Sequence, residues 1–586
     1  MSVIYTKKPN SCGFFENYLL TLQLIKTISR LMNMKLNLLI YIFPLFFICV
    51  GRMSVQADEK QSSPCIVNFV NFIRGIEPRS EEFTKEYLFQ TTANQLSQLN
   101  EYGFHGTFLI QYDALVMPAY QKLLKQAMTE GHEVGAWWEI TEPHVKDAGM
   151  KWRGRFPWDW YANVGFATGY TPEQRERLVD TYMEKFHSIF GTYPASVGSW
   201  FIDAHTLDYL YERYHIVASC NCKDQYGTDG YTLWGGYWNQ AYYPSRLNAY
   251  MPAQTIQEQI PVPIFRMLGS DPVLQYDHGL DRHFQGVITL EPVYKEAGGG
   301  NRDWVEWFLP AMAKSESLAF NYIQAGQENS FGWNDMKDGL SMQMPIIRDF
   351  ADKGRFRVET LAESGRWFKK HFPLTPATAV TVEDDFKTSG MSAVWYNSRY
   401  YRTGLLWKDN SFVIRDIHLF DESIASDYLL KAGTENYCEY ITPPLIDGFI
   451  WSTPEEHAGL RLTQILDNGK TREIPVTSHA CTKKGKDCLA VTCQTPYGPF
   501  RMLMKEDVLT IITYKPAIKW ALEFTAARDA RLPFTSIDNQ VIKATHKGYD
   551  YAIQLRRGSF SAVSTDCSNW RILPQKNRVV FNFGRK

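Results

Sequence analysis

The spacing of hydrophobic residues changes once along the chain, near residues 373–376. Before this point, short apolar runs alternate with stretches whose apolar residues recur every three to four positions. Such runs predict buried parallel strands, and the stretches between them predict amphipathic helices that cover the sheet. The expected strands are 66–73, 107–111, 133–138, 196–202, 216–219, 262–268, 286–290 and 319–323. The expected helices are 86–101, 117–130, 172–190 and 206–214. An alternation of this length predicts a (β/α)7–8 barrel over residues 58–373.

Beyond residue 376, apolar and polar residues alternate with a period of two, between turns rich in Gly, Asn and Asp. This pattern is typical of half-buried antiparallel strands. The expected strands are 393–401, 411–419, 489–493, 500–504, 508–514, 541–545, 551–555 and 579–583. We therefore expect an all-β sandwich over residues 374–586 that packs on the barrel as an accessory domain.

The first 57 residues have the features of an export signal. A basic start at Met34-Lys35 is followed by an apolar run over 38–50 and by small residues that end at Ala57. We interpret 1–57 as an upstream extension and a signal peptide cut after Ala57, which places the protein in the periplasm or outside the cell. The apolar run is shorter than the roughly 20 residues of a spanning helix, so no stable membrane span is expected. An uncleaved anchor is the alternative.

Composition narrows the class of partner. The chain has 62 Lys and Arg against 63 Asp and Glu, and 45% of its residues are hydrophobic. No long basic run occurs, so a nucleic-acid partner is not expected. An exported chain can form disulfides, and Cys481 and Cys488, on either side of a Lys/Gly turn, are the best candidates. For Cys220 and Cys222, buried free thiols are the favoured interpretation.

The candidate catalytic residues are carboxylates that follow apolar runs, because the carboxyl ends of parallel barrel strands carry the chemistry. They are Glu139, Glu291, Asp203 and Glu328. Glycoside hydrolysis needs two facing carboxyl groups, one protonated and one ionised. We favour Glu139 and Glu291 as this pair, because burial beside Trp137 or Trp138 would raise the pKa of Glu139 and keep it protonated. The alternative for each carboxylate is a helix cap or a salt bridge with arginine.

Aromatic and polar residues near the same strand ends are candidates for substrate binding. The residues expected to bind substrate are Arg74, Glu77, Trp137, Trp138, His144, Trp234, Trp238, Asp277 and His278. The glycines in 232–239 indicate an irregular loop, and its tryptophans predict an aromatic-lined cleft for sugar rings. Arg74 could recognise a carboxylate such as that of a uronic acid. Core packing is the alternative for the aromatic residues.

Several segments resemble one family of barrels. Gly106-Thr107-Phe108-Leu109 and Gly131-His132-Glu133-Val134-Gly135, together with 193–195, 206–210 and 214–217, are similar to polysaccharide deacetylase-like (β/α) barrels, a superfamily that also contains glycosidases. The resemblance implies a barrel of the glycoside hydrolase/deacetylase type. Members of this family hold a metal with an Asp in the first strand and two His after the third. Here 71–77 contains no Asp and the third strand is followed by His144 alone, so no metal cofactor is favoured.

A divalent metal is nevertheless an alternative. Asp203-Ala204-His205 places two possible ligands close together, and His144 or His278 could complete a site with nitrogen and oxygen donors. The protein would then be a metal-dependent polysaccharide deacetylase. A third hypothesis is a non-catalytic protein that binds glycans. The sequence as a whole predicts a secreted carbohydrate-active hydrolase, a glycosidase in the first place, whose partner is an oligo- or polysaccharide.

Overall fold

The computed structural model describes residues 63–228, 230–280, 288–564 and 568–584. The predicted signal segment 1–57 lies outside the described residues. Within them, no helix is long and apolar enough to cross a membrane. Residues 63–586 group into one compact unit, so the domain boundary between 373 and 374 stays a prediction. The architecture changes across it, since the last helix of the first half ends at His371 and the next strand begins at Thr378.

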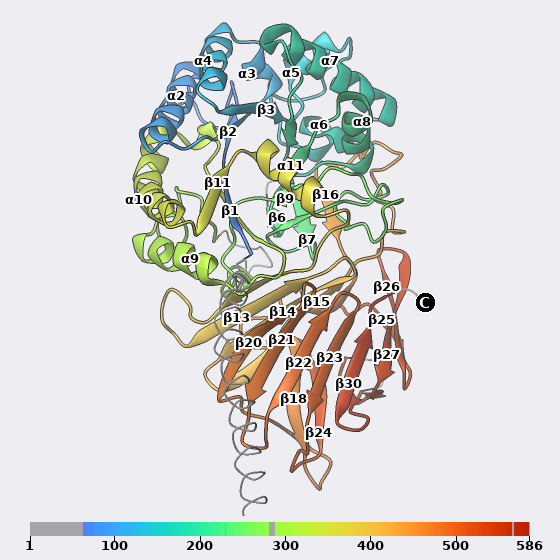
Figure 1. Ribbon diagram of the computed structural model, residues 1–586. Coiled ribbons are helices and arrows are strands. Elements are labelled where there is room, and N and C mark those ends of the chain that lie inside the picture. The colour runs from blue at the N-terminus through green and yellow to red at the C-terminus, as the bar shows by residue number, and fades with distance from the viewer. Residues whose placement is uncertain (1–62, 229, 281–287, 565–567, 585–586) are drawn as a thin grey trace, which may run out of the picture. The chain divides into compact units, whose positions relative to one another are not determined.

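The first half is a parallel sheet curved into an open barrel and covered by helices (Figure 1). The sheet order is β10-β1-β2-β3-β4-β5-β9-β8. The central strand β1 is buried at all nine positions because both of its faces are covered. The strands of this half are β1 (Cys65–Ile73), β2 (Thr107–Ile110), β3 (Glu133–Trp137), β4 (Ser196–Gly198), β5 (Ala218–Asn221), β6 (Gln225–Thr228), β7 (Tyr231–Trp234), β8 (Ala241–Tyr242), β9 (Ile264–Arg266), β10 (Asn321–Ala325) and β11 (Phe356–Glu359). The predicted parallel barrel is confirmed.

The barrel is open between β9 and β10. Part of the expected strand 286–290 lies outside the described residues, and the part that is described forms an isolated bridge between Thr289 and Ser270. Leu290 donates its backbone N–H to the carbonyl of Leu268 at 2.9 Å, so this segment runs beside β9 without extending the sheet.

The four expected helices are present, and their ends follow from capping. In α7, Thr171 and Gln174 form a capping box, and the helix ends at Gly191, whose φ of 77° suits glycine. Sequence analysis missed α9 and α10, which carry Pro310 and Pro345 in their interiors and therefore read as broken helices. The helices are α2 (Lys85–Glu101), α3 (Tyr112–Leu115), α4 (Pro118–Thr129), α5 (Glu142–Asp147), α6 (Ala162–Gly165), α7 (Pro172–Phe190), α8 (Ala204–Tyr214), α9 (Arg302–Lys314), α10 (Trp333–Asp352) and α11 (Leu361–His371), with 3₁₀ turns η1 (Ala167–Gly169) and η3 (Asn329–Phe331).

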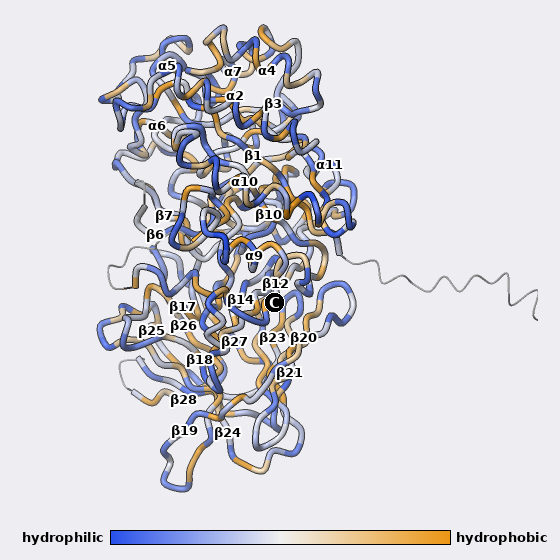
Figure 2. Tube along the Cα trace, turned by 90° about the vertical axis from the view of Figure 1, so that its left-hand side faces the viewer, coloured by the Kyte–Doolittle hydropathy of each residue, from blue (hydrophilic) through white to orange (hydrophobic). Residues whose placement is uncertain are grey.

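The second half consists of two antiparallel sheets, as predicted, and of β16, which pairs in parallel with β7 of the first half. One sheet has the order β12-β13-β14-β15-β18-β24-β29-β28, with β17 beside β15 and β19 beside β18, and the other has the order β20-β21-β22-β23-β30-β27-β26-β25. Burial alternates along β20 and β26, and hydrophobic and hydrophilic residues are mixed along the chain in this half (Figure 2). The strands are β12 (Thr378–Val382), β13 (Met391–Asn397), β14 (Tyr401–Lys408), β15 (Ser411–Leu419), β16 (Cys438–Ile441), β17 (Pro444–Asp447), β18 (Gly459–Ile465), β19 (Thr471–Glu473), β20 (Ser478–Lys484), β21 (Cys488–Gln494), β22 (Phe500–Lys505), β23 (Val508–Thr513), β24 (Trp520–Thr525), β25 (Phe534–Ile537), β26 (Val541–His546), β27 (Tyr549–Arg557), β28 (Ser559–Ala562), β29 (Trp570–Leu573) and β30 (Arg578–Asn582).

The expected disulfide between Cys481 and Cys488 is wrong. Both thiols are free. The β20–β21 register sets Cys481 opposite Val491 and Cys488 opposite Lys484, so the two cysteines do not face each other. Cys220 and Cys222 are buried free thiols, as expected.

Candidate active site

Arg74, the first residue after β1, is the centre of a buried ionic cluster at the carboxyl ends of the strands. Its Nε and Nη2 donate to the two carboxylate oxygens of Glu139 at 3.0 and 2.8 Å. Its Nη1 lies 2.8 Å from Oε2 of Glu328 and 3.7 Å from Oε2 of Glu77. The structure therefore brings predicted site residues from the ends of β1, β3 and β10 together around one guanidinium group.

Two amide side chains hold this cluster in place. Asn329 accepts the backbone N–H of Arg74 and donates to the carbonyl oxygen of Arg74, both at 2.9 Å. Gln111 donates to Oε2 of Glu139 at 2.7 Å. Glu139 thus accepts three hydrogen bonds, two of them from Arg74, whose charge matches its own. Sequence analysis missed both amides, although Gln111 directly follows β2 and could have been found by that position.

Glu328 is the carboxyl group of this cluster whose negative charge is stabilised least by hydrogen bonds. Although Oε2 lies beside Arg74, no residue of the described chain donates a hydrogen bond to it, and it is buried. Burial raises the pKa of Glu328 to about 7, and the opposing charges of Arg74 and Arg79 do not cancel that rise. Glu328 is therefore partly protonated at neutral pH, which suits a group that gives and takes a proton.

Asp113, in the short helix α3, is a second buried acid near Arg74. Its carboxylate accepts the backbone N–H groups of Gly75 at 3.2 Å and Ala114 at 2.7 Å. Burial raises the pKa of Asp113 to about 7 in spite of these two hydrogen bonds. The charge of Glu139 contributes to this rise and that of Arg74 opposes it, so Asp113 responds to the field of the cluster.

Glu291 is connected to Glu328 through one side chain. Its Oε1 accepts Nε2–H of Gln327 at 3.0 Å, and its Oε2 accepts the hydroxyl of Thr289 at 2.7 Å. The carbonyl oxygen of the same Gln327 side chain accepts the backbone N–H of Glu328 at 2.8 Å. Two of the predicted catalytic glutamates are therefore linked by a single amide.

Lys223 is a cation of this face that sequence analysis missed. It is 3% exposed, and its Nζ donates to the carbonyl of Asp224 at 2.8 Å. Burial lowers the pKa of this amine, while Cys222 and Glu291 act in the opposite direction. Its position shortly after a buried strand could have identified Lys223. The expected strand, however, was 216–219, whereas β5 ends at Asn221, two residues before Lys223.

An aromatic segment, residues 156–160, contacts the cluster through Trp158. The ring of Trp158 is 4.2 Å from the guanidinium carbon of Arg74, which is a cation–π contact with a desolvated cation. Phe156 and Trp160 stack with ring centroids 5.7 Å apart, and Phe156 is 39% exposed. A stacked and partly exposed ring suits the apolar face of a sugar.

The predicted metal ligands do not come together. Asp203 caps α8 by accepting the backbone N–H of Thr206 at 2.9 Å, and it pairs with buried Arg175 at 2.9 Å. Nε2 of His205 lies 3.1 Å from Glu176. Across the described ranges, no group of three or more His, Cys, Asp or Glu could hold a metal ion. The proposed ligand set does not fit a metal, and Asp203 has structural partners in place of a catalytic position.

His144, Trp137 and Trp138 are core residues, which corrects the expectation that they contact substrate. His144 stacks on Tyr112 with ring centroids 4.4 Å apart, and burial lowers its pKa to about 4, so it is neutral. Trp138 packs edge-on against His144 at 5.6 Å, and Trp137 stacks on Phe72 at 4.1 Å. None of the three predicted residues is more than 1% exposed.

Trp234 and Trp238 also lie in packed surroundings, so the expected aromatic cleft over 232–239 is wrong. Trp234 belongs to β7, which pairs with β16, and its Nε1 donates to Asp447 at 2.8 Å. Trp238 stacks on Trp395 at 4.6 Å. Both side chains are buried against the all-β half. The glycines of this segment allow close approach of neighbouring groups and do not open a cleft.

Asp277 and His278 have different surroundings. Asp277 is exposed and lines a different cavity, together with residues of the all-β half such as Lys408 and Arg415. His278 is half-buried, and burial lowers its pKa, an effect to which the charge of Lys223 adds. Asp277 therefore does not join Arg74, whereas His278 lies within the field of Lys223.

Comparison with known proteins gives likenesses among solved structures. No family model matches the sequence, and no curated protein matches it. A proposed glycoside hydrolase/deacetylase from Parabacteroides distasonis is 17% identical, with a TM-score of 0.48 over 66% of this chain and 91% of that one. A proposed polysaccharide deacetylase from Mycobacterium smegmatis is 13% identical, with a TM-score of 0.33 over 54% and 94%. A family 4 acetyl xylan esterase from Clostridium thermocellum, solved with a cobalt ion, is 10% identical, with a TM-score of 0.23 over 51% and 89%.

Proposed function

We propose that the barrel is a carbohydrate hydrolase that cleaves a glycosidic bond, with Glu328 as the proton donor. One observation carries the proposal: Glu328 is a buried carboxyl group with a pKa of about 7 and an oxygen that lacks a hydrogen bond. In its protonated form Glu328 gives its proton to the departing oxygen. Arg74, 2.8 Å away, then stabilises the carboxylate that remains.

Glu291 is the second carboxylate of the proposed reaction. It attacks the sugar or activates water, the two roles available to the ionised partner in glycoside hydrolysis. Gln327 orients it and Lys223 supplies a nearby positive charge. Glu139, which sequence analysis paired with Glu291, is bound by Arg74 and Gln111 and acts as a positioning residue.

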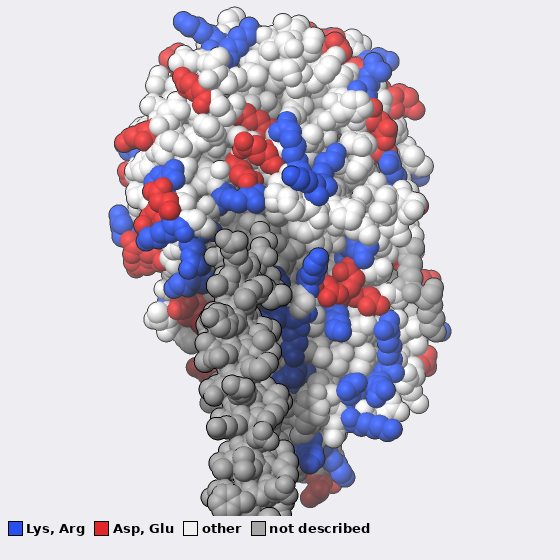
Figure 3. All heavy atoms as spheres, in the orientation of Figure 1, with Lys and Arg blue, Asp and Glu red and all other residues white. Residues whose placement is uncertain are grey.

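The proposed substrate is an oligo- or polysaccharide that approaches past Phe156 and Trp160. Acidic and basic side chains lie next to one another in small groups over the barrel on the face drawn in Figure 3. A mixed charge distribution of this kind, with a net charge of −1, suits a ligand recognised by stacking and hydrogen bonds.

A panel of plain and acetylated polysaccharides tests the proposal, with two products measured in parallel. We expect release of reducing ends, and we expect Glu328→Gln to lower turnover at least a hundredfold, since general acid catalysis contributes about 10²–10⁴-fold. The exposed Glu81 provides the control, and Glu81→Gln should keep full activity. Release of acetate without reducing ends would establish a deacetylase, and full activity of Glu328→Gln would remove Glu328 from the reaction. Binding of a glycan without any turnover would establish the non-catalytic alternative.

We also propose export with cleavage after Ala57. The mass of the protein recovered from the periplasm or the medium should correspond to a chain that begins at Asp58. Recovery of the intact chain in a membrane fraction would favour the uncleaved anchor.

A further inference from the structure

Arg415, in β15, is a buried arginine without a carboxylate partner. Each of the other buried arginines has a carboxylate oxygen within 3 Å: Arg74 with Glu139, Arg175 with Asp203, Arg266 with Asp224, and Arg402 with Asp416. Arg415 is 4% exposed, and no Asp or Glu in the described part of the chain lies within 4.0 Å of its guanidinium nitrogens. Its Nη1 and Nη2 donate to the carbonyls of Val273 and Pro272 at 2.8 and 2.9 Å, and its Nε–H is buried without an acceptor.

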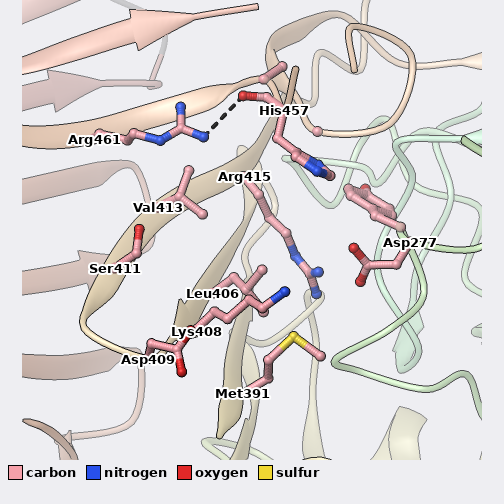
Figure 4. Close-up of a pocket in the computed structure, with 13 residues that line it drawn as sticks. Asp277, Met391, Leu406, Lys408, Asp409, Ser411, Val413, Arg415, His457 and Arg461 are labelled. Atoms are coloured by element: carbon pink, nitrogen blue, oxygen red, sulfur yellow. Dashed lines mark hydrogen bonds between the residues drawn. The ribbon is translucent and has the colours of Figure 1, made fainter. Parts of the chain in front are cut away.

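A cavity of about 320 Å³ lies beside Arg415 (Figure 4). Lys408 and Arg461 line the same space, against the carboxylates of Asp277 and Asp409, so cations are in excess. In Figure 4 the charged ends of Arg415 and Lys408 approach each other from two neighbouring strands. Burial lowers the pKa of Arg415 and of Arg461, and the charges of carboxylates farther away, Asp277, Asp416 and Asp271 for Arg415 and Glu473 for Arg461, do not cancel that effect. An anion in this cavity would give Arg415 the direct carboxylate partner that it lacks.

The other walls of the cavity show which kind of anion fits. Leu406, Val413 and Met391 form an apolar side, and the hydroxyl of Ser411 and the imidazole of His457 are polar groups at its edge. The volume is at the lower end of the range for small-molecule sites, about 300–1,000 Å³. This combination matches a single ring with an apolar face, several hydroxyls and one acidic group.

We propose that this cavity binds a hexuronic acid residue. Its carboxylate pairs with Arg415 and Lys408, its apolar face lies against Val413 and Leu406, and its hydroxyls reach the carboxylate of Asp277. A bidentate carboxylate partner is the arrangement that guanidinium groups favour. The proposal does not depend on the reaction at the barrel, because none of these residues belongs to the Arg74 cluster.

Isothermal titration of the full chain with D-galacturonate, D-galactose and acetate tests the proposal. D-Galacturonate should bind at least tenfold more tightly than D-galactose, which lacks the carboxylate, and than acetate, which lacks the ring. Equal affinity for galactose would contradict recognition of the carboxylate by Arg415. Equal affinity for acetate would contradict recognition of the sugar ring. Trigalacturonate separates two sources of the ligand: tighter binding than the monomer indicates a polymer, and equal or weaker binding indicates a free sugar acid.

Matched lysine variants locate the binding in this cavity. Lys408→Met should weaken galacturonate about threefold or more, whereas Lys543→Met, at an exposed lysine of β26, should leave it unchanged. Glu328→Gln should also leave it unchanged, which separates this site from the barrel. Arg415→Met should abolish binding, with folding checked by the unfolding transition. If Arg415→Met unfolds the protein, the weaker binding of galacturonate by Lys408→Met still supports the site, and unchanged binding by Lys408→Met overturns it.

Discussion

Two buried ionic clusters of the molecule differ in their balance of charge. The cluster between the barrel and the all-β half contains Arg402 and Arg266, which face Asp224 and Asp416. Arg402 pairs with both aspartates and Arg266 pairs with Asp224 at 2.7 Å. Although burial opposes it, the two arginines hold the pKa of Asp224 below its ordinary value. Each charge is matched, so this cluster fixes structure.

The cluster at the strand ends has more carboxylates than arginines. Arg74 and Arg79 face Glu77, Glu139 and Glu328. Glu77 pairs with Arg79 at 2.7 Å, and Arg74 is shared between Glu139, which accepts from two of its nitrogens, and Glu328. Burial, to which the charges of Glu139 and Glu77 add, therefore raises the pKa of Glu328 in spite of Arg74. The balance between buried positive and negative charges, more than their number, therefore decides whether a cluster stabilises the fold or carries chemistry. A matched cluster holds the fold together, whereas an excess of carboxylates keeps one of them protonated and available for chemistry.

The same change from carboxylate to amide in each cluster tests this difference. Asp224→Asn should lower the free energy of unfolding by about 3–5 kcal/mol, because it leaves buried arginine charge uncompensated. Glu328→Gln at pH 8 should lower it by less than about 1 kcal/mol, since Arg74 keeps Glu139 and loses only a carboxylate that burial disfavours. Urea unfolding of both variants measures the effect, and equal losses would contradict the distinction.

The pH dependence of the free energy of unfolding tests the charge balance around one residue of the strand-end cluster, Asp113. The pKa of Asp113 is raised to about 7 in the folded protein, so its contribution to stability is present below the unfolded pKa and is lost as the pH rises through 7. Asp113→Asn should therefore reduce the loss of stability between pH 5 and pH 8, by up to about 1.4 kcal/mol per pH unit. Unfolding of the wild type, this variant and a control at the exposed Asp467, Asp467→Asn, checks the slope. An unchanged slope in Asp113→Asn would refute the raised pKa.

The smallest expected effect is at the aromatic border of the site. Phe156→Ala should raise KM for the polysaccharide about threefold with kcat unchanged, because stacking on an exposed ring contributes about 0.5–1.5 kcal/mol. Tyr514, 62% exposed in the all-β half, gives the matched control, and Tyr514→Ala should change neither constant. A fall in kcat in Phe156→Ala would place this ring in the chemical step and not at the entrance.

The fold class could be predicted because the spacing of hydrophobic residues is a local property of the sequence. They recur every three to four positions in the helices and every second position in the half-buried strands. α7 and β15 have the predicted bounds, since a capping box marks the start of α7 and β-branched and aromatic residues fill β15 between turns. β11 was missed because its burial depends on pairing with β1, almost 300 residues away. The interior prolines of α9 and α10 hid two long helices.

For the site, position at a strand end predicted Arg74, Glu139 and Glu328, because parallel strands end on one face. Their roles could not be predicted, since these roles depend on how the hydrogen bonds and ion pairs of Arg74 are divided between Glu139 and Glu328 in the folded protein. Tertiary packing also decided that Trp234 is buried, because its ring packs against Tyr276 and Phe449.

The protonation state of Glu328 is the most direct test of this account. Infrared spectra of the wild type between pH 5 and pH 9, compared with those of Glu328→Gln, isolate the band of this protonated carboxyl group. The account predicts a band that is present at pH 6, absent from the variant and lost with a midpoint near pH 7. A carboxyl group already ionised at pH 5 would contradict it.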